Sequence, residues 1–255
     1  MKKTYISLII LAQLILSCSN SNDNSVQQVF PMFKFTHNWD GQNITNVDFN
    51  TIQFTNENGD ELSIERLRYV ISDITFTSES NQVLVINNFN LVDVTNSQNI
   101  VYEFASQVPV GTYQVSFTFG LDDEDNAENY VYLNSQSFNV PDMLGGGYHY
   151  MQLDGKFINS SMQEQGYNYH AIRAVDNPGA NPTFPQDTFF NVNLGTITIT
   201  EGTEVEVKMN IAEWFKNPHS WDLNVLNQML MPNSATQIII SENGESVFSL
   251  GEVTP

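Results

Sequence analysis

The feature of this sequence that most constrains its fold is the alternation of apolar and polar side chains over many short segments. Phe33, Phe35, His37 and Trp39 occupy every second position of one such segment. This period places them on one face of a β-strand, because successive side chains of a strand point to opposite faces. Similar patterns predict strands over residues 67–77, 83–86, 91–94, 113–119, 148–158, 167–175, 188–200, 203–211, 236–241 and 246–250.

Only one segment carries a clear helical pattern. Ser220 is a favourable N-cap, Leu and Met recur at helical spacing over residues 221–231, and Pro232 ends the pattern. Many short strands and a single helix indicate an all-β fold. We therefore expect an antiparallel β-sandwich with one short C-terminal helix.

The N-terminus has the three parts of an export signal. Lys2 and Lys3 provide a positive start, residues 6–16 form a short apolar run, and Ser17 places a small residue directly before Cys18. The apolar run is too short to span a bilayer permanently. Because Cys18 is the only cysteine of the chain and stands at the +1 position of a lipoprotein cleavage site, we expect it to carry the lipid.

These features divide the chain into three parts. Residues 1–17 are predicted to be a lipoprotein signal peptide, and residues 18–28, polar and rich in Ser and Asn, a flexible tether. Residues 29–255 are predicted to form the β domain. The protein is then expected in the bacterial cell envelope, anchored in the outer membrane on its periplasmic or surface face.

The charge of the chain excludes several classes of partner. The formal net charge is −20, and removal of residues 1–17, which hold two lysines and no acids, makes it about −22. Such a charge argues against nucleic acid and against anionic lipid bound through basic patches. With Cys18 acylated, no disulfide, thiolate ligand or cysteine nucleophile remains.

No catalytic constellation is recognisable. The sequence has no Gly-x-Ser-x-Gly elbow, no phosphate-binding glycine loop and no His-Glu-x-x-His, and its acidic residues are scattered. The acidic run 122–129 resembles a calcium loop but lacks the central glycine and distal glutamate of an EF-hand, so we expect a solvated loop. We therefore expect a binding protein, not an enzyme.

Three of the four histidines are candidate metal ligands. His37, His149 and His170 lie in predicted strands, on faces with apolar or aromatic neighbours, whereas His219 lies in a predicted loop. Neutral imidazole, with a nearby thioether such as that of Met151, suits copper, above all Cu(I). A buried histidine that only makes a hydrogen bond remains the alternative for each of the three.

Several segments together resemble the MbnP-like family of copper-binding periplasmic or surface proteins, which has many lipoprotein members in bacteria of the Bacteroidetes type. The most specific segment is the run from Gly146 to Gly155, with His149 inside it. The other segments are 67–74, 91–93, 108–113, 119–122 with Asn126 downstream, 169–172 and 214–215.

The resemblance implies a β-sandwich-like fold that holds one copper ion through histidines, with a redox or transport partner protein. In the best-known relatives a tryptophan before the Gly-Tyr pair is oxidised to kynurenine by a partner peroxidase and ligates the metal. Here the corresponding residues 141–147 contain no tryptophan, so that ligand is not carried over. His37, His149 and His170 are then the predicted copper ligands of an envelope lipoprotein.

Two other functions remain open at this point. A non-catalytic module for a glycan, a peptide or a partner lipoprotein would use exposed Tyr and Asn side chains. A hydrolase has the least support, because no catalytic group stands out.

Overall fold

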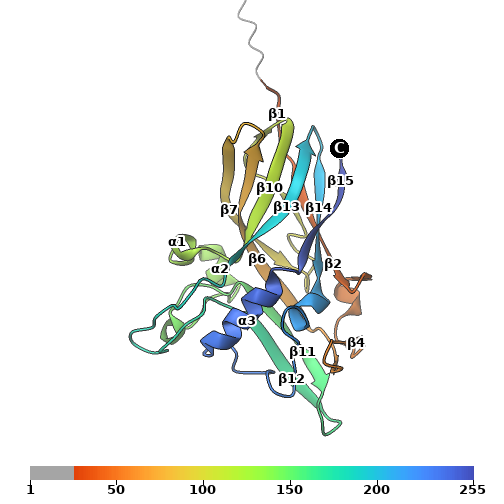
Figure 1. The fold of residues 1–255 in the computed structure, drawn as a ribbon, viewed down its shortest axis with the longest axis vertical. Coiled ribbons are helices and arrows are strands. Elements are labelled where there is room, and N and C mark those ends of the chain that lie inside the picture. The colour runs from red at the N-terminus through yellow and green to blue at the C-terminus, as the bar shows by residue number, and fades with distance from the viewer. Residues whose placement is uncertain (1–25) are drawn as a thin grey trace, which may run out of the picture.

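A computed structural model describes residues 26–255, which form two β-sheets packed face to face, with an extension below them (Figure 1). The smaller sheet has five strands: β2 (Met32–Trp39), β3 (Gln42–Ile44), β8 (Val101–Glu103), β14 (Glu204–Asn210) and β15 (Phe248–Thr254). The larger sheet has eight strands: β4 (Phe54–Thr55), β5 (Glu61–Leu62), β6 (Arg66–Ser78), β7 (Val83–Asp93), β10 (Gly111–Phe119), β11 (Met151–Ile158), β12 (Glu164–Ala171) and β13 (Phe190–Ile199).

Two short strands, β1 (Gln28–Val29) and β9 (Val108–Pro109), pair with each other. Of the described strand pairs, β2 with β14 is parallel and the others are antiparallel. The predicted all-β sandwich is confirmed.

The long strand β6 connects the sandwich to the extension. Along one edge β6 pairs with β7, whereas its other edge is divided between β10 and β11. At the division, the Val70 N–H donates to the Tyr150 carbonyl (2.9 Å) and the Val70 carbonyl accepts from the Gly120 N–H (2.9 Å). The hairpin of β11 and β12 therefore leaves the sandwich at a defined point, one residue after His149.

Aromatic side chains fill the space between the two sheets. Phe33 of β2 packs edge-to-face on Phe117 of β10, with ring centroids 6.3 Å apart, and Phe35 packs on Tyr69 of β6 at 6.1 Å. Edge-to-face pairs of this kind add to the stabilisation that burial of apolar area gives. The alternation in residues 33–39 thus has the expected cause, since this face of β2 is buried in the core.

The helices differ from the sequence-based expectation. The described α-helices are α1 (Asp123–Asn126), α2 (Val131–Ser135) and α3 (Ser234–Gly244), and the 3-10 turns are η1 (Asn46–Asp48), η2 (Asp142–Leu144) and η3 (Ile211–Phe215). Part of the acidic run, expected to be a loop, forms α1.

The predicted helix over residues 221–231 is wrong, and the C-terminal helix is instead α3, where a strand over 236–241 had been expected. In 221–231 the backbone bonds to other segments: the Leu223 N–H donates to Asp60 and the Asn227 carbonyl accepts from Asn168. The Asn233 side chain caps α3 by accepting from the Thr236 N–H.

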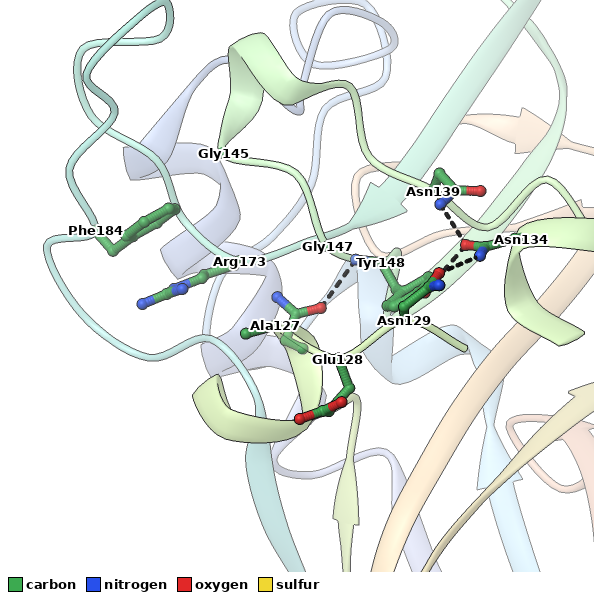
Figure 2. A pocket seen from close by; sticks show the side chains of 11 residues that line it. Ala127, Glu128, Asn129, Asn134, Asn139, Gly145, Gly147, Tyr148, Arg173 and Phe184 are labelled. Carbon is green, nitrogen blue, oxygen red and sulfur yellow. Dashed lines mark hydrogen bonds between the residues drawn. The ribbon is translucent and has the colours of Figure 1, made fainter. Parts of the chain in front are cut away.

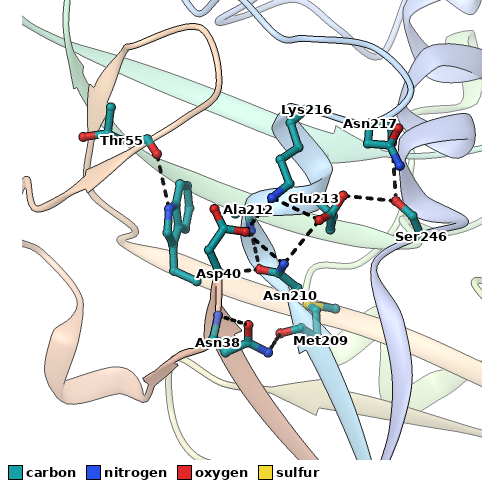
Figure 3. A network of polar contacts seen from close by, with 12 residues as sticks. Asn38, Asp40, Thr55, Met209, Asn210, Ala212, Glu213, Lys216, Asn217 and Ser246 are labelled. Atoms are coloured by element: carbon teal, nitrogen blue, oxygen red, sulfur yellow. Dashed lines mark hydrogen bonds and ion pairs between the residues drawn. The ribbon is translucent and has the colours of Figure 1, made fainter.

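A polar network lies at the C-terminal ends of β2 and β14 (Figure 3). The Lys216 ammonium lies between the carboxylates of Asp40 (2.5 Å) and Glu213 (3.1 Å), and the Asn210 side chain accepts from the Asp40 N–H at 2.9 Å. Trp39 beside it donates its indole N–H to the Thr55 carbonyl. This network ties β2 to the turn η3 that follows β14.

The predicted signal peptide and Cys18 lie outside the described residues, as does most of the predicted tether. The tether prediction ends at Gln28, which the structure places in β1, paired with Pro109. Among residues 26–255, no helix is both long enough and apolar enough to cross a bilayer.

Gly155 of β11 is the position where the fold leaves least room for a side chain. A Cβ there would lie 2.0 Å from the Ser63 carbonyl oxygen and 2.7 Å from the Tyr167 ring. We expect Gly155→Ala to lower the free energy of unfolding by about 2 kcal/mol or more, because backbone must shift to relieve the overlap. Urea unfolding followed by tryptophan fluorescence measures this.

Gly166→Ala is the matched control, since a Cβ at this neighbouring position of β12 meets no atom closer than 3.9 Å. A control variant destabilised as much as Gly155→Ala would contradict this account of the packing.

Candidate metal centre

His149 lies just before β11 and is held by a single backbone carbonyl. Its backbone N–H and its ring Nδ1 both contact the Phe138 carbonyl oxygen, at 2.8 and 2.9 Å. Because a carbonyl oxygen only accepts, Nδ1 carries the proton. Burial lowers the pKa of His149 from 6.5 to about 4. The ring is therefore neutral at pH 7, with the lone pair of Nε2 available.

His170 of β12 is held by a carboxylate. Its Nε2 lies 2.7 Å from Oδ1 of Asp154 in β11. Burial alone raises the pKa of Asp154, but hydrogen bonds from His170 and Asn168 and the charge of Arg66 lower it to about 2. Asp154 is thus ionised at pH 7 and accepts a hydrogen bond from Nε2, which leaves Nδ1 as the ring nitrogen that Asp154 does not hold.

The two histidines lie against each other. Their ring centroids are 5.2 Å apart and their planes are nearly perpendicular, at 81°. The described residues 26–255 make no hydrogen bond to His149 Nε2 or to His170 Nδ1. Each ring thus has one nitrogen tied to an acceptor and the other unused, which is the usual arrangement of metal-binding histidines.

This arrangement suits a metal of low coordination number. In the part of the chain that the structure describes, no group of three or more His, Cys, Asp or Glu side chains is placed to hold a metal ion. A tetrahedral zinc site needs more such ligands than the pair offers. Neutral imidazole is a ligand for both copper and zinc, and two such ligands match the low coordination number that Cu(I) accepts.

The structure does not bring His37, the third predicted ligand, to this pair. His37 belongs to β2 of the smaller sheet, and its Nε2 lies 3.0 Å from the Tyr69 hydroxyl. Burial lowers the pKa of His37 to about 3, so its ring is neutral. Its place in the fold is that of a core histidine satisfied by a hydrogen bond.

Met151, Trp39 and His219 have surroundings of their own in the structure. Met151 is fully buried in the main core. Trp39 stacks on Phe54, with ring centroids 4.9 Å apart. His219 is partly exposed and pairs with Glu242 at 2.5 Å.

Three supports of the histidine pair were not recognisable in the sequence. They are the Phe138 carbonyl, the Asp154 carboxylate and the amide of Gln237 in α3, which donates to the His170 carbonyl at 2.9 Å. Asp154 lies in the middle of β11, and nothing else in the sequence of this strand marks it as a partner of a histidine. The one signal available was a charged residue at a position predicted to be in a strand.

The comparisons with known proteins concern the family and the fold. The family model for MbnP matches residues 28–233, which is most of the chain. The chain belongs to the MbnP family. Among solved structures, MbnP from Methylosinus trichosporium matches with a TM-score of 0.56 and 13% sequence identity, over 89% of this chain and 99% of that chain. No match was found among curated protein sequences.

Membership of this copper-associated family supports a copper-related role in general terms. The likeness to MbnP from Methylosinus trichosporium, at 13% identity, concerns the fold. The assignment of residues to such a role therefore depends on the geometry of this chain.

The segment before His149 departs from the pattern that the resemblance to MbnP proteins implied. Gly145, Gly146 and Gly147 all have positive φ, between 68° and 94°, a conformation in which a tryptophan is strained. A Cβ at Gly147 would also lie 2.7 Å from the Asn126 amide, which accepts the Tyr148 N–H at 2.9 Å. The backbone at this position is therefore built for glycine.

Gly145 and Gly147 border a polar pocket of about 420 Å³ (Figure 2). Its wall includes the side chains of Asn129, Asn134 and Asn139. The Arg173 guanidinium lies 3.5 Å from the centre of the Phe184 ring and covers that face, and Tyr148 is buried. The pocket thus offers amide groups but no open aromatic face for a sugar to stack on.

The buried His37 predicts a measurable pH dependence of stability. Its pKa is about 3 in the folded state and 6.5 in an unfolded chain, so between these values the unfolded state binds the extra proton. Stability is therefore lost as the pH falls from 6.5 toward 3. We expect the free energy of unfolding to fall more steeply with decreasing pH in wild type than in His37→Gln over this window. The difference between the two slopes corresponds to at most about one bound proton.

Urea unfolding at a series of pH values from about 3.5 to about 7.5 gives both slopes, because this range lies on both sides of the pKa of histidine in an unfolded chain. The other titrating groups are common to the two proteins and cancel in the comparison. Parallel curves for wild type and His37→Gln would show that His37 is not buried in its neutral form.

Proposed function

We propose that this protein is a membrane-anchored, extracytoplasmic lipoprotein that binds copper between His149 and His170, for acquisition, buffering or transfer of the metal. The observation that carries the proposal is the contact of the two rings, 5.2 Å between centroids, with one nitrogen of each ring held by an acceptor. His37 is not part of the proposed ligand set, because its Nε2 contacts Tyr69.

The charges around the two histidines favour binding of a cation but are partly balanced, so the bound cation can be released. The Asp154 carboxylate stands behind His170 and increases its ligand strength, as an outer carboxylate does in other metal sites. Arg66 forms an ion pair with the same carboxylate and limits the local negative charge. The net charge of −20 for the whole chain raises the concentration of cations near its surface.

The proposed role is binding and not catalysis. The two histidines bind and orient the metal, Asp154 and the Phe138 carbonyl fix which ring nitrogen is available, and no step of substrate turnover is assigned to them. The alternative, a non-catalytic module for a glycan, a peptide or a partner protein, has in its favour the asparagine-lined pocket beside Tyr148.

The copper site is tested by anaerobic titration of the full-length protein with Cu(I) against a chromophoric Cu(I) chelator. Wild type is expected to take up a single copper ion. His149→Ala and His170→Ala are each expected to lower the affinity by at least about 100-fold, because loss of an outer partner alone costs about 10- to 100-fold.

His219→Ala serves as the matched control, since this partly exposed histidine pairs with Glu242 away from the two rings. Copper binding that is equal in wild type, His149→Ala and His170→Ala would overturn the proposal, as would the absence of uptake by wild type.

The anchor is a separate part of the proposal and rests on the sequence before residue 29. Metabolic labelling with a radioactive fatty acid in a bacterial host is expected to mark the wild-type protein and not Cys18→Ala. Equal labelling of the two proteins, or labelling of neither, would remove the lipid anchor and the outer-membrane location that depends on it.

A further inference from the structure

A groove of about 490 Å³ lies beside His170 and contains three methionines. Met143, Met229 and Met231 line it together with His170. Met143 is 62% exposed and Met229 79% exposed, although large apolar side chains are normally placed in the core. The two largely exposed thioethers beside this groove, those of Met143 and Met229, are therefore a feature that packing does not explain.

The residues next to these methionines show how the groove is built. Leu144 and Leu230 are buried, and they hold the two segments that carry Met143, Met229 and Met231. Leu144 packs with Ile172 in a small cluster that is separate from the main core. Met231 is partly buried against this small cluster. The buried leucines do the packing, so Met143 and Met229 are free to serve another purpose.

The segment with Met229 and Met231 is fixed to the strand that carries His170. The Gln237 amide donates both to the His170 carbonyl (2.9 Å) and to the Leu230 carbonyl (3.2 Å), and it is fully buried. On the same strand, the Asn168 N–H donates to the Asn227 carbonyl at 2.8 Å. These bonds hold the methionine segment along the edge of β12, so that Met229 and Met231 line the same groove as His170.

The backbone at Met229 is also unusual. Its φ is +57°, a left-handed conformation that residues other than glycine, asparagine and aspartate seldom adopt. Such strain is tolerated where the surrounding structure imposes it, often at functional sites. At this position a glycine would relieve the strain, and the chain instead has a methionine that faces the groove.

We propose that a thioether of this groove completes the copper site of His149 and His170 and makes it selective for Cu(I). This inference rests on the proposed function, because it assigns a further ligand to the same site. Thioether sulfur is a soft, neutral ligand that favours Cu(I) over Cu(II) and over zinc. The only cysteine of the chain is Cys18, so no thiolate is available within residues 26–255 to take this role.

Methionine is also suited to passing the metal on. Its side chain is flexible and polarisable and adapts to irregular surroundings. With Met143 and Met229 exposed at the mouth of the groove, Cu(I) can move between thioethers of the groove and the two imidazoles without a change of oxidation state. The groove is then the route by which copper enters and leaves.

The test is the triple variant Met143→Leu/Met229→Leu/Met231→Leu, which removes sulfur and keeps apolar volume. In the anaerobic chelator competition we expect its Cu(I) affinity to fall by at least about tenfold, the lower limit for loss of an outer partner. We expect its Cu(II) affinity to change much less. X-ray absorption at the copper edge is expected to show a sulfur neighbour in wild type and none in the triple variant.

Met162→Leu is the matched control, because Met162 is 82% exposed in the turn between β11 and β12 and does not line the groove. Circular dichroism melting checks that the triple variant folds; if it does not, the single variants Met143→Leu and Met229→Leu, both at exposed positions, replace it.

The outcomes separate the two proposals. Copper binding that needs His149 and His170 but shows no sulfur neighbour and no loss in the methionine variants would overturn the thioether ligand alone. Binding that does not need the histidines would overturn the proposed function. An equal loss in Met162→Leu and in the triple variant would also overturn the assignment of the groove.

Discussion

The arrangement of the strands around the histidine pair depends on the two backbone hydrogen bonds of Val70, which go to different neighbouring segments. Its N–H donates to Tyr150 and its carbonyl accepts from Gly120, so β6 changes partner from β11 to β10 at this residue. The sandwich ends there and the β11–β12 hairpin begins. His149 lies next to Tyr150, outside regular strand pairing, and can therefore turn toward Phe138 and His170. The histidine pair is a consequence of this division.

The sequence predicted the fold class and two members of the proposed site, but not their contact. Strand parity grouped His149 with Met151, whereas the structure buries Met151 in the main core and directs His149 to His170. Parity holds only within a regular strand, and the chain bends at Tyr150 before β11 starts. His37 fitted its pattern and yet lies on another sheet, because a pattern gives the face of a strand and not the neighbour across it.

The C-terminal region was predicted least well, for a related reason. The run of β-branched residues in α3 favoured a strand, and the spacing of Leu223, Leu226 and Leu230 favoured a helix before it. Hydrogen bonds to distant residues overrode the helical pattern of 221–231, and a local cap together with buried contacts of Gln237 favoured α3. Asn233 starts α3 by capping it, and Gln237 then places its amide where it joins the segment before α3 to β12. A local pattern does not reveal such partners, since they are distant in the sequence.

The glycine run before His149 limits the substitutions that this part of the chain can accept. A tryptophan introduced at Gly147 would meet Asn126, and Asn126 in turn holds the backbone of Tyr148, the neighbour of His149. A Gly147→Trp substitution would therefore displace the backbone next to His149. Any side chain at position 147 therefore requires a change of Asn126 in α1 as well, so this one residue links the helix to the backbone beside His149.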